Sequence, residues 1–183
     1  MFTDGRSRKV VFVAHCLLNQ NAISDQTAVY PAAFRDVVDF FLERDVGIVQ
    51  MPCPELCCLS LDGGDPAGGT REVTVENTRI RAAMADPGPH EMLMRLADLV
   101  LLQIREYHKH GFQILGIVGA NRSPNCGVDT TSADNQELPG RGLFMEELER
   151  RLTARGLSLP MVGLKASDNV PAKLQNLLSG LQS

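Results

Sequence analysis

Short apolar runs alternate along the chain with longer segments in which apolar residues recur every three or four positions. The runs at 9–14, 46–51, 112–118 and 159–164 are short, apolar and rich in Val, Ile and Leu, which predicts four buried strands. Helical spacing predicts helices at 30–42, 74–84, 89–110, 143–155 and 170–181. Strands that alternate with helices in this way predict an α/β fold with a Rossmann-like, mainly parallel sheet of about four strands and helices on both faces.

Proline, glycine and loop length refine this outline. Pro31 suits the first position of the first helix, and Pro160 favours an edge position for the last strand. The segment 62–70 is rich in Gly and Asp, and the loop at 121–141 is long enough to indicate function or disorder. No repeat or linker divides the chain, so we expect residues 1–183 to form a single domain in which 1–8 is a flexible tail.

Composition and charge narrow the class of protein. Apolar residues make up 44% and charged residues 22% of the 183 residues, as in ordinary globular proteins. A net charge of −4 argues against a nucleic-acid-binding module. No apolar run approaches the ~20 residues that span a bilayer. The first nine residues lack the apolar stretch of a secretory signal, so we expect a cytoplasmic protein without membrane contact.

The positions of the cysteines are the main chemical signal. Cytosolic thiols stay reduced, so the five cysteines do not predict a disulfide framework. Cys16 and Cys53 each follow a predicted strand by two residues, and Cys126 lies in the loop after the third strand. The carboxyl ends of parallel strands share one edge of the sheet, where ligands bind. The topology therefore predicts that these three cysteines meet at one site.

Three thiolates suit a soft metal. One candidate is an iron–sulfur cluster; a cubane usually has four Cys ligands, so three would leave one iron open. The other is zinc, whose structural sites usually show paired Cys spacing, and only Cys53 and Cys57 are so spaced. Cys57 and Cys58 fall in a predicted loop, and we interpret them as packing residues or oxidation-prone thiols.

Three short motifs give a more specific indication. His-Cys-Leu-Leu-Asn-Gln-Asn at 15–21, Cys-Pro-Glu at 53–55 and Ser-Pro-Asn-Cys-Gly at 123–127 resemble, in order and placement, the motifs of the TudS-type desulfidases across nearly the whole chain. The type member of that family is a thiouracil desulfidase. The resemblance implies a 4Fe–4S cluster held by Cys16, Cys53 and Cys126, with one iron open to substrate, and catalytic roles for Glu55 and Ser123.

The chain departs from the family pattern in each motif. Asn125 stands where the family usually has Ser, and Leu56-Cys57-Cys58 follows Cys-Pro-Glu where the family usually continues with a Gly-Gly stretch. The first motif reads Leu-Leu-Asn-Gln-Asn rather than Leu-Leu-Gly. These differences indicate a diverged branch.

The predicted function is cluster-dependent, non-redox removal of sulfur from a small thiocarbonyl compound, such as a thiolated nucleobase. An open iron would act as a Lewis acid, Glu55 would activate water and Ser123 would donate or relay a proton. His15, Asn19 and Asn121 are weaker candidates for substrate binding, since loop asparagines often cap turns.

Other readings of the pattern stay open. One alternative is a non-catalytic cluster-binding sensor or carrier, and another is a zinc or thiol redox protein. Glu55 and Ser123 favour the enzyme, because cluster binding alone requires neither. The expected partner is a small thiocarbonyl compound; a thiolated RNA base and a second copy in a homodimer are left open as further partners.

Overall fold

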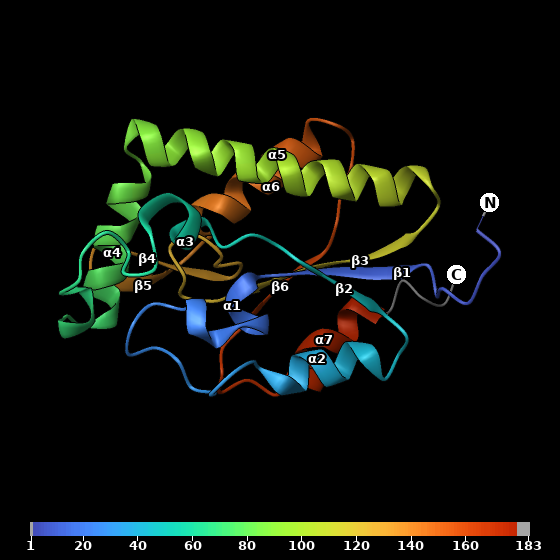
Figure 1. The fold of residues 1–183 in the computed structure, drawn as a ribbon, viewed down its shortest axis with the longest axis horizontal. Coiled ribbons are helices and arrows are strands. Elements are labelled where there is room, and N and C mark those ends of the chain that lie inside the picture. The colour runs from blue at the N-terminus through green and yellow to red at the C-terminus, as the bar shows by residue number, and fades with distance from the viewer. Residues whose placement is uncertain (1, 179–183) are drawn as a thin grey trace.

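A parallel four-stranded sheet organises the protein, whose computed structural model describes residues 2–178. The strands are β1 (Lys9–Val13), β2 (Gly47–Gln50), β3 (Gln113–Ala120) and β6 (Met161–Leu164). They lie in the order β2-β1-β3-β6, and all three pairings are parallel (Figure 1). This confirms the predicted α/β class and its four strands. Pro160 directly precedes β6, which lies at a sheet edge as expected.

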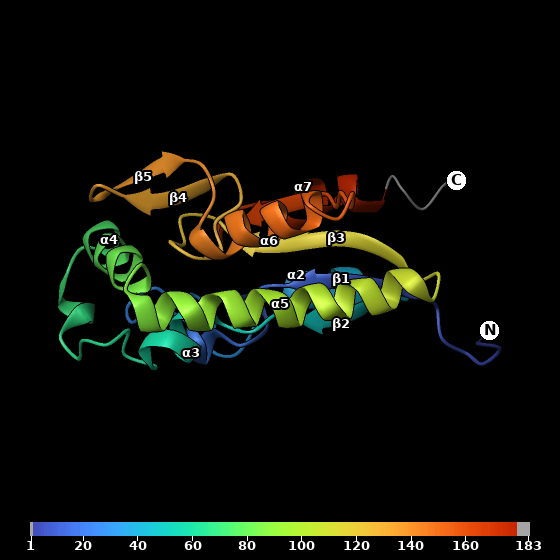
Figure 2. The same cartoon turned by 90° about the horizontal axis from the view of Figure 1, so that it is seen from above.

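Helices cover both faces of this sheet, which is also confirmed. The helices are α1 (His15–Leu18), α2 (Arg35–Leu42), α3 (Pro54–Leu59), α4 (Val73–Met84), α5 (Pro87–Lys109), α6 (Leu143–Thr153) and α7 (Val170–Leu178), with 3₁₀ turns η1 (Gln20–Ala22) and η2 (Gly68–Thr70). α5 and α6 pack on one face and α2 and α7 on the other (Figures 1 and 2). The last predicted helix was expected to reach residue 181, and its final three residues lie outside the described range.

The core lies between these layers. β1 is apolar over most of its length because both of its faces are covered, and Val11, Phe12 and Val13 have no exposed surface. α5 contributes Leu93, Ala97, Val100, Leu101 and Ile104 from one stripe. Among residues 2–178, no helix is long and apolar enough to cross a membrane.

The first predicted helix begins later than expected. α2 starts at Arg35 rather than at Pro31. The backbone of the preceding residues pairs with the segment after β1 instead: Gln20 N donates to Ala32 O at 2.6 Å, and Phe34 N donates to Leu17 O at 2.9 Å. Those hydrogen bonds hold residues 30–34 in a non-helical path beside the end of β1.

Two predicted loops contain regular structure. The loop 121–141 includes an antiparallel hairpin of β4 (Thr130–Ala133) and β5 (Gln136–Pro139). Its turn residues, Asp134 and Asn135, both have positive φ, as a type I′ turn requires. The expectation that Cys57 and Cys58 lie in a loop was wrong, because both belong to α3, which begins at Pro54.

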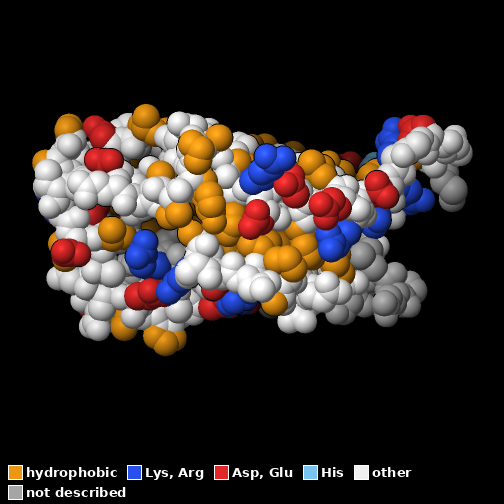
Figure 3. Space-filling view, turned by 90° about the horizontal axis from the view of Figure 1, so that it is seen from below, with side chains coloured by type: hydrophobic (Ala, Val, Ile, Leu, Met, Phe, Trp, Pro, Cys, Tyr) orange, Lys and Arg blue, Asp and Glu red, His pale blue; other side chains and the backbone are white. Residues whose placement is uncertain are grey.

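The face over α2 and α7 carries mixed charge. Figure 3 shows Lys and Arg side chains interspersed there with Asp and Glu, and apolar side chains exposed between them. Leu42, the last residue of α2, is an exposed apolar residue. Positive charge is therefore not concentrated in a single stripe on this face.

The strand order creates one special position. From β1 the chain adds β2 on one side and later β3 on the other, so the direction of winding reverses between β1 and β3. Loops leaving the carboxyl ends of strands at such a switch point diverge and leave a crevice, which is where α/β sheets bind ligands.

Candidate functional site

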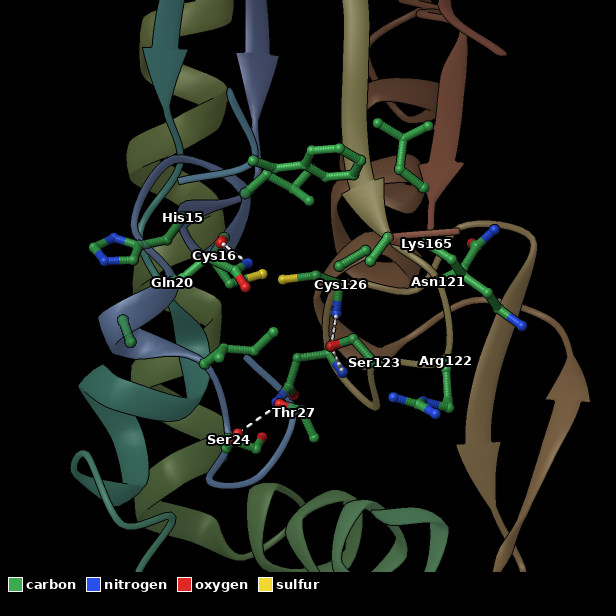
Figure 4. Close-up of a pocket in the computed structure, with 18 of the residues that line it drawn as sticks. His15, Cys16, Gln20, Ser24, Thr27, Asn121, Arg122, Ser123, Cys126 and Lys165 are labelled. Atoms are coloured by element: carbon green, nitrogen blue, oxygen red, sulfur yellow. Dashed lines mark hydrogen bonds between the residues drawn. The ribbon is translucent and has the colours of Figure 1, made fainter. Parts of the chain in front are cut away.

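A pocket of about 320 Å³ lies at this switch point, a volume near the lower end of the ~300–1,000 Å³ that is common for small-molecule sites. Segments after all four parallel strands line it: Cys16 follows β1, Cys53 follows β2, Cys126 follows β3 and Lys165 follows β6. Figure 4 shows Cys16 and Cys126 projecting from opposite walls with their sulfur atoms toward each other. The three predicted cysteines therefore share one cavity.

Burial makes these thiols hard to ionise. It raises the pKa of Cys16 to about 12, with further contributions from Cys53 and Glu55. Burial likewise raises the pKa of Cys53 to about 11 and that of Cys126 well above its usual range, and for Cys126 the other two cysteines add to the effect. All five cysteines are free. In this low-dielectric pocket the thiols stay protonated unless a cation replaces their protons.

Within residues 2–178, no group of three or more His, Cys, Asp or Glu side chains has the arrangement that holds a single metal ion. The ligand role of the three cysteines therefore stays a prediction. Two features support that prediction: the three cysteines share one cavity, and their sulfur atoms are soft donors.

α3 places Glu55 beside Cys53. Cys53 is the N-cap of this helix, and its sulfur accepts from Leu56 N at 3.5 Å. Glu55 lies in the first turn and lines the pocket, where Ser24 Oγ donates to its Oε1 at 3.1 Å. Burial raises the pKa of Glu55 and nearby Glu76 adds to this, while Ser24 opposes it. A carboxyl with a raised pKa is suited to proton transfer near neutral pH.

Ser123 organises the loop that carries Cys126. Its hydroxyl oxygen accepts from the backbone N–H groups of Asn125, at 3.3 Å, and Cys126, at 3.0 Å. Its carbonyl accepts from Gly127 N at 3.1 Å, which tightens the same turn. The hydroxyl proton is then free to point to a ligand, since the oxygen is used as an acceptor.

The three weaker candidates lie in different surroundings. His15 lines the pocket, but Figure 4 shows its ring directed away from Cys126, and its ring nitrogens lie 2.8 Å from Gln50 Nε2 and 3.5 Å from Asn19 Nδ2. Burial lowers the pKa of His15, which favours the neutral ring. Asn19 caps η1 through Asn21 N and is not part of the described pocket lining. This capping contact of Asn19 is the structural role that loop asparagines often have.

Asn121 lines the pocket, yet its carboxamide is occupied by its own loop. Oδ1 accepts from the backbone N–H groups of Val128, Asp129 and Thr130, and Nδ2 donates to the Asp129 carboxylate at 2.9 Å. The side chain thus fastens the loop around Cys126, and its substrate-binding role stays a prediction for which one N–H of Nδ2 is left.

Several pocket residues were not singled out from the sequence. Ser24 and Tyr30 come from the irregular segment between η1 and α2, and Arg122 has a left-handed backbone with φ 70°. Asn125 is 2% exposed, and neither polar atom of its side chain has a hydrogen-bond partner in the described part of the chain. Of these four residues, only Asn125 was noticeable in the sequence, because it stands where the third motif usually has Ser.

Fold and site together define a parallel α/β protein with a cysteine-lined pocket at its switch point. No family model matches the chain. An uncharacterized protein of Methanocaldococcus jannaschii, MJ0003, is 27% identical over 142 residues, which are 78% of this chain and 76% of that protein. Among solved structures, the [4Fe-4S]-dependent thiouracil desulfidase TudS aligns with 92% of this chain and 97% of its own, at 18% identity and a TM-score of 0.45.

Proposed function

We propose that this protein is an iron–sulfur desulfidase that hydrolyses the C=S group of a small thiocarbonyl compound. One observation carries the proposal: the three motif cysteines, far apart in the sequence, line one pocket together with Glu55 and Ser123. Packing alone gives no reason for three thiols to gather at a ligand-binding edge beside a partly buried carboxyl.

The donor set fits a cluster with three protein ligands. Cys16, Cys53 and Cys126 would hold it, because thiolates are the usual ligands of such clusters and these thiols lie within each other's electrostatic influence. Binding would displace the three thiol protons, and the positive charge of the iron would offset the cost of holding three thiolates away from water. When bound, the cluster supplies an open iron that acts as a Lewis acid toward a soft sulfur atom.

The protein's own groups would handle water and protons. Glu55 takes a proton from water, whose oxygen forms a bond to the thiocarbonyl carbon, and the Ser123 hydroxyl donates a hydrogen bond to a polar atom of the substrate without losing its proton. The C=S bond is replaced by C=O, and both protons of the water leave with the sulfur as hydrogen sulfide. No electron is gained or lost, so the reaction needs no external reductant.

Cluster binding is tested first. Protein reconstituted under argon should be brown and contain iron and acid-labile sulfide. Cys16→Ala, Cys53→Ala and Cys126→Ala should each abolish the visible absorption, whereas Cys57→Ala is the matched control because Cys57 is exposed. A colourless protein with tightly bound zinc would refute the cluster.

Catalysis is tested by sulfide release from thiolated pyrimidines and related thioamides. Glu55→Gln should keep the visible spectrum and lower turnover by ~10²–10⁴-fold, as expected for loss of a general base. Ser123→Ala should retain the cluster with a similar or smaller loss, and Glu91→Gln, on an exposed face of α5, is the control. Undiminished turnover in Glu55→Gln would show that Glu55 has no catalytic role. If the wild-type protein with its cluster releases no sulfide, the alternative of a non-catalytic, cluster-binding sensor or carrier is favoured.

A further inference from the structure

A single side-chain hydrogen bond joins the irregular segment at 19–34 to the helix that carries Glu55. Ser24 Oγ donates to Glu55 Oε1 at 3.1 Å, although the two residues are 31 positions apart. Both also line a second cavity, of about 430 Å³, on the other side of the contact. The acidic residues Asp25, Asp62, Asp65 and Glu76 lie around that cavity. Ser24 and Glu55 therefore form part of the partition between two cavities.

The backbone on either side of Ser24 is fixed by its own contacts. Gln20 donates from Nε2 to Cys16 O at 2.8 Å, and its Oε1 accepts from Val29 N at 3.1 Å, so it ties the two ends of the segment together. Thr27 Oγ1 donates to Ser24 O, which holds the peptide that presents the Ser24 hydroxyl. Figure 4 shows Ser24 and Thr27 side by side at the pocket wall. The hydroxyl is thus presented from an ordered segment.

Glu55 has no comparable donor elsewhere among the described side chains. Arg79 is the nearby cation, but its hydrogen bonds go to Glu76 and to Gly63 O. Without Ser24, the carboxyl could rotate about its side-chain bonds toward the second cavity, where space is available.

We propose that Ser24 is a positioning residue whose hydroxyl keeps the Glu55 carboxyl at the wall of the cysteine-lined pocket and fastens the segment 19–34 beside it. The catalytic part of this inference rests on the proposed function, because it assigns water activation to Glu55. The fastening part concerns only the folded chain. The two parts therefore require separate measurements.

Hydrogen exchange of the full-length protein tests the fastening. In Ser24→Ala, amides of segment 19–34 should exchange about fivefold faster, as expected for loss of one hydrogen bond. Glu55→Ala should have a similar effect, and the double variant should exchange no faster than the faster single variant, because both changes remove the same contact. Wild-type exchange in Ser24→Ala, or effects that multiply in the double variant, would overturn the proposal.

Steady-state kinetics test the positioning. Ser24→Ala should lower kcat about tenfold and leave KM within about twofold, because the substrate-binding contacts stay in place. Ser24→Thr, which retains the hydroxyl, should restore most of kcat, and Ser158→Ala is an exposed control with the same chemical change. A raised KM with unchanged kcat, or no rescue by Thr, would overturn a positioning role. If the wild-type holo-protein releases no sulfide, the proposed function fails, while hydrogen exchange still decides whether Ser24 holds Glu55.

Discussion

The substitution Asn121→Ala tests whether Asn121 stabilises the loop around Cys126 or binds substrate. In the structure its Oδ1 accepts from Val128 N at 3.3 Å, Asp129 N at 3.0 Å and Thr130 N at 3.4 Å, and Nδ2 donates to Asp129 Oδ2 at 2.9 Å. Alanine removes all of these contacts. The loop around Cys126 would then lose the side chain that fixes its backbone after the cysteine.

The cost of this substitution can be worked from those contacts. A protein hydrogen bond contributes about 1 kcal/mol net, and two of the bonds to Asn121 are long, so about 2–4 kcal/mol of the free energy of unfolding should be lost. A chain of 183 residues changes its Tm by about 2–4 °C per kcal/mol. The melting temperature should therefore fall by roughly 4–16 °C.

Thermal denaturation of the cluster-free protein, followed by circular dichroism, measures this change. Asn169→Ala is the matched control, since among residues 2–178 Asn169 Oδ1 accepts only from Ala172 N, and loss of that bond should cost about 1 kcal/mol. Gly163→Ala should behave like Asn121→Ala, because a Cβ at Gly163 would overlap the Asn121 carboxamide. An unchanged Tm in Asn121→Ala, together with a raised KM, would refute the structural role and restore substrate binding.

Two further predictions concern ionisation. Because burial raises the pKa of Cys16 to about 12, this thiol in cluster-free protein should react with iodoacetamide far more slowly than the exposed Cys57; equal labelling of the two residues in peptide mass spectra would contradict this. Hydrogen bonds from Arg79 and Arg71 lower the pKa of Glu76, so Glu76→Gln should be destabilised by about 2 kcal/mol at pH 7. That difference should shrink as the pH falls below about 4.5 and through the native pKa of Glu76, because the wild-type carboxylate is then protonated. Urea denaturation at pH 7 and at pH 3.5 measures the difference in the free energy of unfolding between the two proteins. An equal difference at both pH values would contradict the prediction.

The sheet was accessible from the sequence because its strands are buried. Parallel strands with both faces covered form nearly continuous apolar runs, and residues 9–14 and 112–118 are of this kind. Their order along the chain then predicted that Cys16, Cys53 and Cys126 would reach one edge. Topology thus placed the three cysteines without any knowledge of side-chain contacts.

The elements that were missed lack such a pattern. β4 and β5 read Thr-Thr-Ser-Ala and Gln-Glu-Leu-Pro, which show little apolar alternation, so only the Asp134-Asn135 turn could have indicated a hairpin. α3 has six residues, too few for a helical stripe to repeat. Ser24 lies in a segment without periodicity, and its contact with Glu55 exists only once β1 and β2 are paired. Local pattern holds no information about contacts of that kind.

The two walls of the pocket differ in how firmly hydrogen bonds hold them, and this difference bears on the position of Glu55. The loop of Cys126 is fixed by Ser123 and Asn121 from within and by Arg81, which donates to Pro124 O at 3.3 Å. The opposite wall, segment 19–34, is tied at its ends by Gln20 and by Phe34 N, which donates to Leu17 O at 2.9 Å. It also reaches α3 through the Ser24 contact and the loop after β6 through Tyr30 Oη, which donates to Ala166 O at 3.3 Å. Fewer hydrogen bonds join that wall to the rest of the protein than hold the Cys126 loop. The hydrogen bond to the Glu55 carboxyl comes from this less firmly held wall, so the position proposed for Glu55 depends on how well segment 19–34 stays in place.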